Sequence, residues 1–201
     1  MFDAAGKPVV GCESEACASA VTAEVVVIGL VRVLGSLPVL RWSLAGGLLA
    51  ILVDLSDLLL RDTLDLGGVP DYQSFDKWAD QVYLATFLVV ALRWQGLERA
   101  IAVALYVFRL VGFIAFELTG WRPALLIFPN VFELWFLLIA AIHVLRPDHR
   151  WRASTLGITL VVLTGIKEVQ EWALHGARLF DGISSLDFLD LVWRRLTGQD
   201  R

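Results

Sequence analysis

The sequence predicts an all-α integral membrane protein, in which a bundle of six transmembrane helices precedes an amphipathic helix lying in the membrane interface. Hydrophobic residues make up 57% of the 201 residues, whereas about 45–50% is usual in soluble domains. Several apolar runs approach the roughly 20 residues that cross a bilayer as a helix. A chain inside lipid must also satisfy its own backbone hydrogen bonds, which helices do within one segment.

Six segments have the length and apolar content of membrane spans. They are 21–40, 42–61, 77–94, 99–119, 123–145 and 153–175. The first is the weakest because Glu24 and Arg32 interrupt it, and an interfacial helix there would leave five spans. We therefore expect a polar leader over 1–20, the helical bundle over 21–176 and an amphipathic tail over 177–201.

The two ends of the chain carry weaker signals. We expect no signal peptide over 1–20, because the segment has no basic start and no apolar core. A disulfide between Cys12 and Cys17 is possible if the leader faces an oxidising compartment, and two free thiols are an equal alternative. In the tail, Ser184 and Asp187 fit a helix-start capping box, so this segment is expected to lie along the outer interface.

The charges of the loops predict the orientation. The connections at Arg41, between Arg93 and Arg99, and over 146–152 are basic, whereas the connection over 62–80 is acidic. By the positive-inside rule the basic loops are cytoplasmic and the acidic loop is outside. Six spans then place both termini outside, and five place the N-terminus inside.

Polar residues within the spans are the main functional signal, because a charge in the hydrocarbon layer costs roughly 2.5–3.5 kcal/mol. With a rise of about 1.5 Å per residue, most of them fall at one depth in the outer half of the bilayer. The expected pocket residues are Asp54, Asp57, Asp76, Asp80, Tyr83, Glu117, Asn130, Glu133, Lys167, Glu168, Glu171 and His175, with Arg109 nearer the midplane.

Helical spacing predicts that these residues share faces. Asp76 and Asp80, like Asn130 and Glu133, are three or four positions apart and are therefore neighbours on a helix surface. Charged faces of membrane helices turn toward the bundle interior or a water-filled cavity. The sequence therefore predicts an acidic pocket that opens outward.

The pocket holds more acids than bases. Eight carboxylates face mainly Lys167, Arg61 and Arg109, and crowded carboxylates cannot all stay ionised and unpaired. Protons or cations must neutralise them. Mg²⁺ and Ca²⁺ prefer oxygen ligands, and one histidine among carboxylates would also suit Mn²⁺ or Zn²⁺. Pro129 frees a backbone carbonyl one turn earlier, which is either a further ligand or the origin of a kink.

The order of the aspartates resembles a known family. Asp54-Leu-Ser-Asp57 followed by Asp76-Lys-Trp-Ala-Asp80 is similar to the D-x-x-D-G-x-x-A-R and G-x-x-x-D-x-x-x-D pattern of the CDP-alcohol phosphotransferases, which are six-helix membrane enzymes. The stretch 75–92 also resembles the continuation of this pattern in that family. The resemblance implies that the four aspartates hold a divalent metal and that Asp80 is the general base.

The chain departs from the family pattern at its small residues. Leu58 and Tyr72 replace the two glycines, and Arg61-Asp62 replaces Ala-Arg. The small residues of the family let a nucleotide approach the backbone. The family's site also faces the cytoplasm, whereas the loop charges place these aspartates outside.

Three functional classes remain open. The first is a multi-pass cell-membrane protein that binds cations or protons for transport or channel activity. The second is a divalent-metal enzyme acting on a lipid or isoprenoid head group, and the third is a structural or accessory subunit. The net charge of −4 argues against nucleic acid. The expected partners are the bilayer and a small cation, a proton or a lipid-like ligand, and the sequence leaves a homo-oligomer open.

Overall fold

The computed structural model describes residues 22–63, 72–121, 123–149 and 151–171, which contain helices and no strands. The first half forms α2 (Ala23–Ser36), the 3₁₀ helix η1 (Leu37–Leu40), α3 (Ser43–Thr63) and α4 (Tyr72–Ala91). The second half forms α5 (Gly96–Thr119), α6 (Pro123–Ile127), α7 (Val131–Leu145) and α8 (Ala153–Glu171). The predicted all-α class is confirmed for this part of the chain. The predicted leader, with Cys12 and Cys17, and the predicted amphipathic tail lie outside the described residues.

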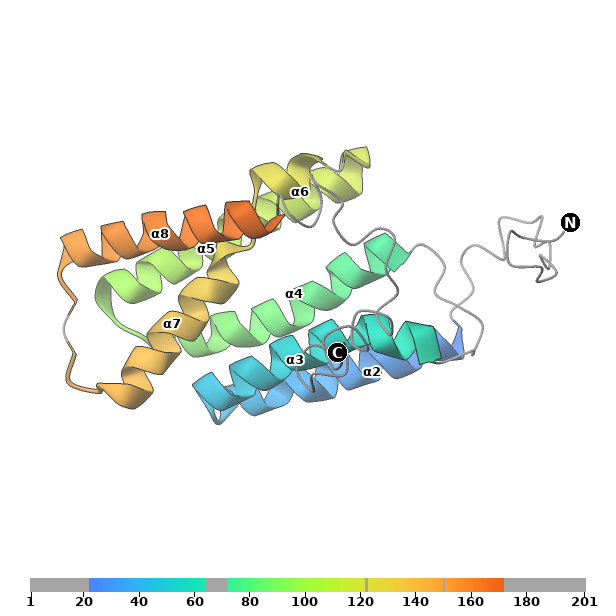
Figure 1. Cartoon of the computed structure of the whole chain (residues 1–201), viewed down its shortest axis with the longest axis horizontal. Coiled ribbons are helices and arrows are strands. Elements are labelled where there is room, and N and C mark those ends of the chain that lie inside the picture. Colours follow the sequence, from blue (N-terminus) through green and yellow to red (C-terminus); the bar gives the residue numbers. More distant parts are fainter. Residues whose placement is uncertain (1–21, 64–71, 122, 150, 172–201) are drawn as a thin grey trace, which may run out of the picture.

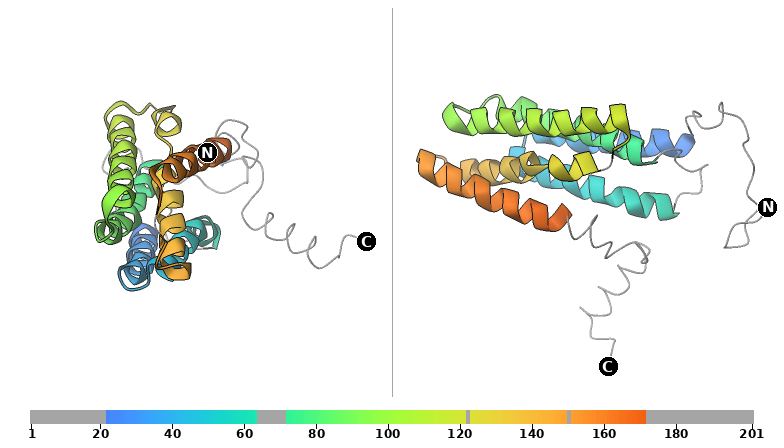
Figure 2. Two further views of the ribbon diagram at one scale, coloured as in Figure 1. Left: turned by 90° about the vertical axis from the view of Figure 1, so that its left-hand side faces the viewer. Right: turned by 90° about the horizontal axis from the view of Figure 1, so that it is seen from above.

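The long helices run along the long axis of the molecule and alternate in direction (Figure 1). The connections α2–α3, α4–α5 and α7–α8 all lie at one end, on the left in Figure 1. Helix α2 packs against α3 and α4, whereas α7 contacts α3, α4, α5 and α8. Figure 2 shows the bundle from two further sides, with α8 at its margin.

Local sequence explains several helix ends. Thr22 caps α2 by accepting a hydrogen bond from the backbone N–H of Val25 (3.2 Å). Pro38 lies in the first turn of η1, where a missing N–H costs nothing. Helix α5 ends at Gly120, whose φ of 65° is left-handed and whose N–H donates to the Phe116 carbonyl.

The prediction of one continuous span over 123–145 is wrong. The structure divides it into the short α6 and the longer α7, with the break at Phe128, Pro129 and Asn130. Proline lacks an N–H and its ring clashes with the preceding helical turn, so the helix stops before it. The break leaves backbone groups that side chains must satisfy.

Two segments are long and apolar enough to cross a membrane, judged by length and composition of the described residues. They are Ala23–Leu40, formed by α2 and η1, and α5. The apolar stretches Ser43–Ser56 of α3 and Val131–Leu145 of α7 are shorter. The first segment was expected to be the weakest span, yet it passes because its valines, leucines and isoleucines outweigh Glu24 and Arg32.

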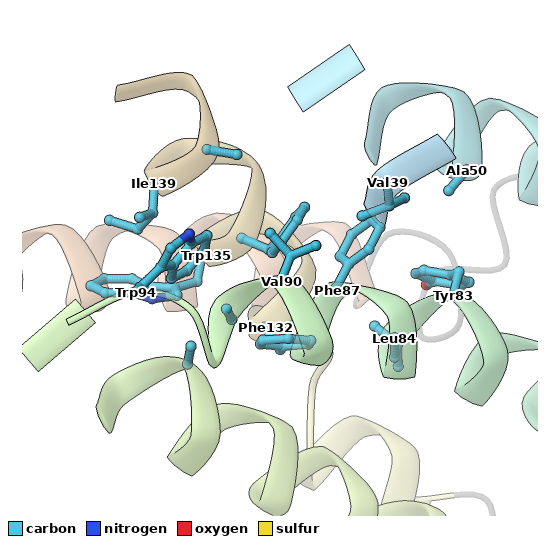
Figure 3. Close-up of a cluster of buried hydrophobic side chains, with 14 of the residues drawn as sticks. Val39, Ala50, Tyr83, Leu84, Phe87, Val90, Trp94, Phe132, Trp135 and Ile139 are labelled. Carbon is cyan, nitrogen blue, oxygen red and sulfur yellow. The ribbon is translucent and has the colours of Figure 1, made fainter. Parts of the chain in front are cut away.

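Aromatic side chains fill the core toward the end of the bundle where α4 turns into α5 (Figure 3). Phe87 stacks on Phe136 with their ring centroids 4.1 Å apart, and Trp94 also stacks on Phe136, with a centroid distance of 5.4 Å. Phe132 and Trp135, also from α7, are completely buried beside them. These rings fix α4 against α7.

Large apolar side chains also cover much of the outer surface. On α8, Ile158, Val161 and Val169 are each exposed by about two thirds or more (67%, 73% and 68%). Exposed leucines, valines and isoleucines likewise occur on α2, α3 and α5. Monomeric soluble proteins rarely expose large contiguous apolar patches.

Close packing at the start of α3 gives a test of the fold. A Cβ on Gly46 would overlap backbone atoms of Pro38 and Val39. Gly46→Ala is therefore expected to lower the free energy of unfolding by about 1–3 kcal/mol, the usual cost of overpacking. Thermal unfolding in detergent measures this loss.

The matched control is Gly157→Ala in α8, where an added Cβ would meet nothing within 4 Å. This variant should raise the free energy of unfolding by about 0.5–1 kcal/mol, because alanine favours the helix. Equal stability of the two variants would contradict the close approach of α3 to η1.

Candidate functional site

A buried arginine on α2 lies among three aspartates from two other helices. Arg32 Nη2 is 2.7 Å from Asp54 Oδ1 of α3 and 2.8 Å from Asp76 Oδ1 of α4. Its Nη1 is 3.4 Å from Asp80 Oδ1, one helical turn further along α4. The Arg32 side chain is 4% exposed. This guanidinium is therefore the cation around which the aspartates gather.

Lys77 supplies a second cation from α4 itself. Its Nζ lies 2.7 Å from Asp76 Oδ2 and 3.3 Å from Asp80 Oδ2. Arg32 Nη1 also donates to the Asp76 carbonyl at 3.1 Å, which ties the guanidinium to the backbone of α4. We call Asp54, Asp76 and Asp80, with Arg32 and Lys77, the aspartate cluster. Three acids and two bases leave it one negative charge in excess.

Helix geometry explains how these residues meet. Asp76 and Asp80 are four positions apart and share one face of α4. Helix α2 packs against both α3 and α4, so a long side chain from α2 reaches between them. Asp54 and Asp76 keep 25% and 21% of their side chains exposed, whereas Arg32 is enclosed. Asp54 and Asp76 are therefore the accessible acids of the cluster, whereas Asp80 is buried.

A second polar group lies where α4 meets the start of α7. Glu133 Oε2 accepts hydrogen bonds from the Asn130 amide (3.0 Å) and the Tyr83 hydroxyl (3.4 Å). Lys167 Nζ, from α8, is 3.9 Å from the same oxygen and is buried. Asn130 Nδ2 also lies 3.3 Å from the Tyr83 oxygen. We call these four residues the Glu133 group.

Arg109 binds the backbone at the break between α6 and α7. Its Nη1 donates to the Phe128 carbonyl at 2.9 Å. The arginine is buried on α5, which packs against both α6 and α7. Pro129 was expected to free a carbonyl one turn earlier. The structure instead shows that Arg109 binds the carbonyl of Phe128, the residue directly before the proline.

The other expected pocket residues lie elsewhere on the molecule or outside its described part. Glu117 is exposed and accepts a hydrogen bond from Ser74 Oγ at 2.9 Å. Glu168 is exposed on α8. The side chains of Asp57 and Glu171, and the whole of His175, lie outside the described residues.

The expected excess of acids changes accordingly. Four of the eight carboxylates contact cations in the described part of the chain, and each of these four is buried or only partly exposed. They are Asp54, Asp76, Asp80 and Glu133. Arg32 and Lys77 were not counted as their partners. Arg32 was interpreted as an interruption of a weak span, and Lys77 was given no role. A buried arginine in an apolar run was the available signal, because such a charge requires a partner.

The three aspartates have the spacing of a metal site, because one carboxylate oxygen from each lies within 4.8 Å of the others. Oxygen atoms of this kind suit a hard divalent cation. The Arg32 guanidinium, however, contacts all three carboxylates. Arg32 would have to move aside for the cluster to hold a metal.

Comparisons with known proteins found no match to this chain, whether among family models, curated proteins or solved structures. The similarity to the CDP-alcohol phosphotransferases therefore rests on the spacing of the aspartates and on the stretch 75–92.

The ion pairs of Arg32 can be tested by unfolding. Arg32→Gln leaves three carboxylates without their shared cation, and breaking a buried ion pair from one side costs about 3–5 kcal/mol. We expect that loss in the free energy of unfolding in detergent. Adding Asp54→Asn to Arg32→Gln should restore part of it, because one of the unpaired charges is then gone.

The matched control removes an exposed arginine. Arg41 follows η1 and is exposed, so Arg41→Gln should change the free energy of unfolding by no more than about 0.5 kcal/mol. If Arg32→Gln were no more destabilising than Arg41→Gln, the ion pairs would not hold α2 in place.

Proposed function

We propose that the protein is a multi-pass protein of the cell membrane in which the aspartate cluster binds protons or small cations during transport or channel activity. The observation that carries the proposal is the composition of the cluster. Three carboxylates share two cations, and the excess charge lies on residues that are partly accessible.

The surface of the bundle supports a membrane location. Apolar side chains are exposed on helices all around it, and two segments have the length and composition of membrane spans. Lipid would cover such a surface, whereas water would not solvate it favourably. Six spans would result if α3, α4, α7 and α8 cross together with these two segments.

The burial of charges in the aspartate cluster supports ion binding over the role of ordinary solvated surface charges. Asp80 and Arg32 are buried among helices, where an unbalanced charge is costly. One proton on Asp54, or one monovalent cation beside it, would make the cluster neutral. Such an ion would bind and leave through the accessible acids while Arg32 and Lys77 keep α2 and α4 in register.

The Glu133 group supports a path for the ion within the bundle. Tyr83 follows Asp80 by three residues on α4 and donates to Glu133 of α7. Lys167 of α8 lies 3.9 Å from the same Glu133 oxygen. Hydroxyl, carboxylate and amine groups that lie next to one another in space are suited to pass a proton from one to the next.

Flux into liposomes tests the proposal. Asp54→Asn keeps the shape of the side chain but cannot release a proton or neutralise a cation. We expect proton or monovalent-cation flux through reconstituted wild-type protein and flux at the level of protein-free liposomes for Asp54→Asn. A pH-sensitive dye and a cation-sensitive dye, used separately, identify the ion.

The control for the flux measurement is Asp148→Asn, which removes an exposed acid from the α7–α8 connection. Its flux should equal that of the wild type. Equal flux through Asp54→Asn and the wild type would exclude the aspartate cluster from transport, and no flux through any of the three would favour a structural or accessory subunit.

A divalent-metal enzyme acting on a lipid or isoprenoid head group is the second candidate. The mutual approach of the three carboxylates within 4.8 Å favours it. The fourth aspartate of the resemblance, Asp57, belongs to α3, and its side chain is outside the described part of the chain.

Metal analysis separates the two candidates. Because Arg32 contacts all three carboxylates, we expect purified wild-type protein to carry less than one equivalent of Mg²⁺, Ca²⁺ or Mn²⁺ by elemental mass spectrometry. One equivalent that disappears in Asp76→Asn and Asp80→Asn would favour the enzyme instead.

A further inference from the structure

We propose that a cavity at the end of the bundle away from the aspartate cluster binds the phosphate group of an amphipathic ligand. The cavity has a volume of about 790 Å³ and lies where the α4–α5 turn meets the α7–α8 connection. Along α4, Asp80 is eleven residues before the last residue, Ala91, which corresponds to about 17 Å at the rise of a helix. The cavity is thus separate from the aspartate cluster.

Two tryptophans form apolar walls of the cavity. Trp94 is held in place by stacking on Phe136 and by an edge-to-face contact with His143 at 5.5 Å. Trp151 makes an edge-to-face contact with His149 at 4.7 Å. Rings fixed in this way offer flat apolar surface that loses little side-chain freedom when a ligand binds.

The lining also carries donors suited to an anion. Arg93 lines the cavity and donates from Nη1 to the Leu40 carbonyl at 3.1 Å. A guanidinium has five N–H donors, so this bond leaves others for a ligand. The Trp151 indole nitrogen is buried without a hydrogen-bond acceptor among the described residues. A buried donor of this kind is costly unless an acceptor reaches it.

The acid in the lining is hydrogen-bonded to a histidine of the same lining. Glu98 Oε2 lies 2.8 Å from His143 Nε2, so this oxygen already has a hydrogen-bond partner in the lining. Gln95, at the N-cap of α5, makes no side-chain cap hydrogen bond. The first-turn N–H groups of α5 have no acceptor within the helix, and the positive end of its dipole lies beside the cavity.

Size and charge together define the ligand class. A phosphate ion alone would leave most of 790 Å³ empty, whereas a phosphate ester could place its apolar part against Trp94 and Trp151. Exposed Arg146 and Arg152 in the adjoining connection add positive charge. A phospholipid head group and a soluble phosphate ester share this chemistry.

Lipid retention by full-length protein tests the site. The protein is placed in phosphatidylcholine nanodiscs with or without phosphatidylglycerol, and native mass spectrometry counts the anionic lipid that stays bound. Arg93→Gln should weaken this binding by about tenfold, as expected for a hydrogen bond to a charged group. The matched control, Arg99→Gln, removes the same charge from the first turns of α5 outside the lining and should bind as the wild type does.

A second variant keeps the test valid if Arg93→Gln folds poorly. Trp151→Phe retains an aromatic wall but removes the unpartnered N–H. It should unfold at the same temperature as the wild type, or higher, in detergent without anionic lipid, and should still bind phosphatidylglycerol less tightly.

Competition identifies the source of the phosphate. Glycerol 3-phosphate that displaces bound phosphatidylglycerol, or that quenches tryptophan fluorescence without lipid, would indicate a soluble ester. Retained lipid without either effect would indicate a head group. Equal binding by Arg93→Gln and Arg99→Gln, or no binding of either ligand to the wild type, would overturn the proposal. None of these readouts involves ion flux, so they stand apart from the proposed transport.

Discussion

The contact of one guanidinium with three carboxylates fixes the first half of the bundle. Arg32 is enclosed between α2, α3 and α4, and removal of either partner would leave a buried charge. Because the guanidinium must reach Asp54 and Asp76 at once, α2 has one register against its neighbours. The same register allows η1 to approach Gly46 of α3 so closely that no Cβ fits. An apolar helix thus carries a charge that positions it.

The inner face of α4 is polar near its start and aromatic near its end, and the helices packed against it show the same division. Asp76 and Asp80 lie in the first half of α4, and Tyr83 and Phe87 continue the same stripe into the aromatic core. Polar side chains therefore meet at one end of the bundle and rings at the other. Because α7 begins beside Tyr83 and ends beside Trp94, it crosses both regions. The helix break before α7 places Asn130 in the polar region, and the rings of α7 pack in the other.

Sequence patterns predicted much of this arrangement. Apolar runs predicted the helices, and i, i+4 spacing predicted that Asp76 and Asp80 share a face. Depth in the bilayer predicted that residues of α3, α4, α5, α7 and α8 meet. The structure brings Asp54 to the α4 aspartates and Lys167 to Glu133, whereas Glu117 of α5 is exposed. The partners of the acids were missed. Periodicity fixes the face on which a residue lies but not which helix covers that face, so nothing in the apolar run around Arg32 indicated that α2 packs against α3 and α4. Pro129 was expected to supply a carbonyl ligand or a kink and not to end the helix, because whether a proline bends or ends a helix depends on tertiary contacts such as that of Arg109.

The excess of acids over bases in the aspartate cluster favours an ion-binding role over a purely structural one. Two cations would need only two acids to hold α2, α3 and α4 together, and a third acid adds a desolvation cost. On the proposed function this third acid is the binding site, and Asp54 suits the role because it contacts Arg32 yet remains partly accessible. An ion on Asp54 would weaken one of the three contacts of Arg32 while the two to α4 remain. Binding would thereby change how strongly α3 is held to α2 without releasing α4. On the proposed function, a cluster of this composition would couple the occupancy of one carboxylate to the packing of one helix.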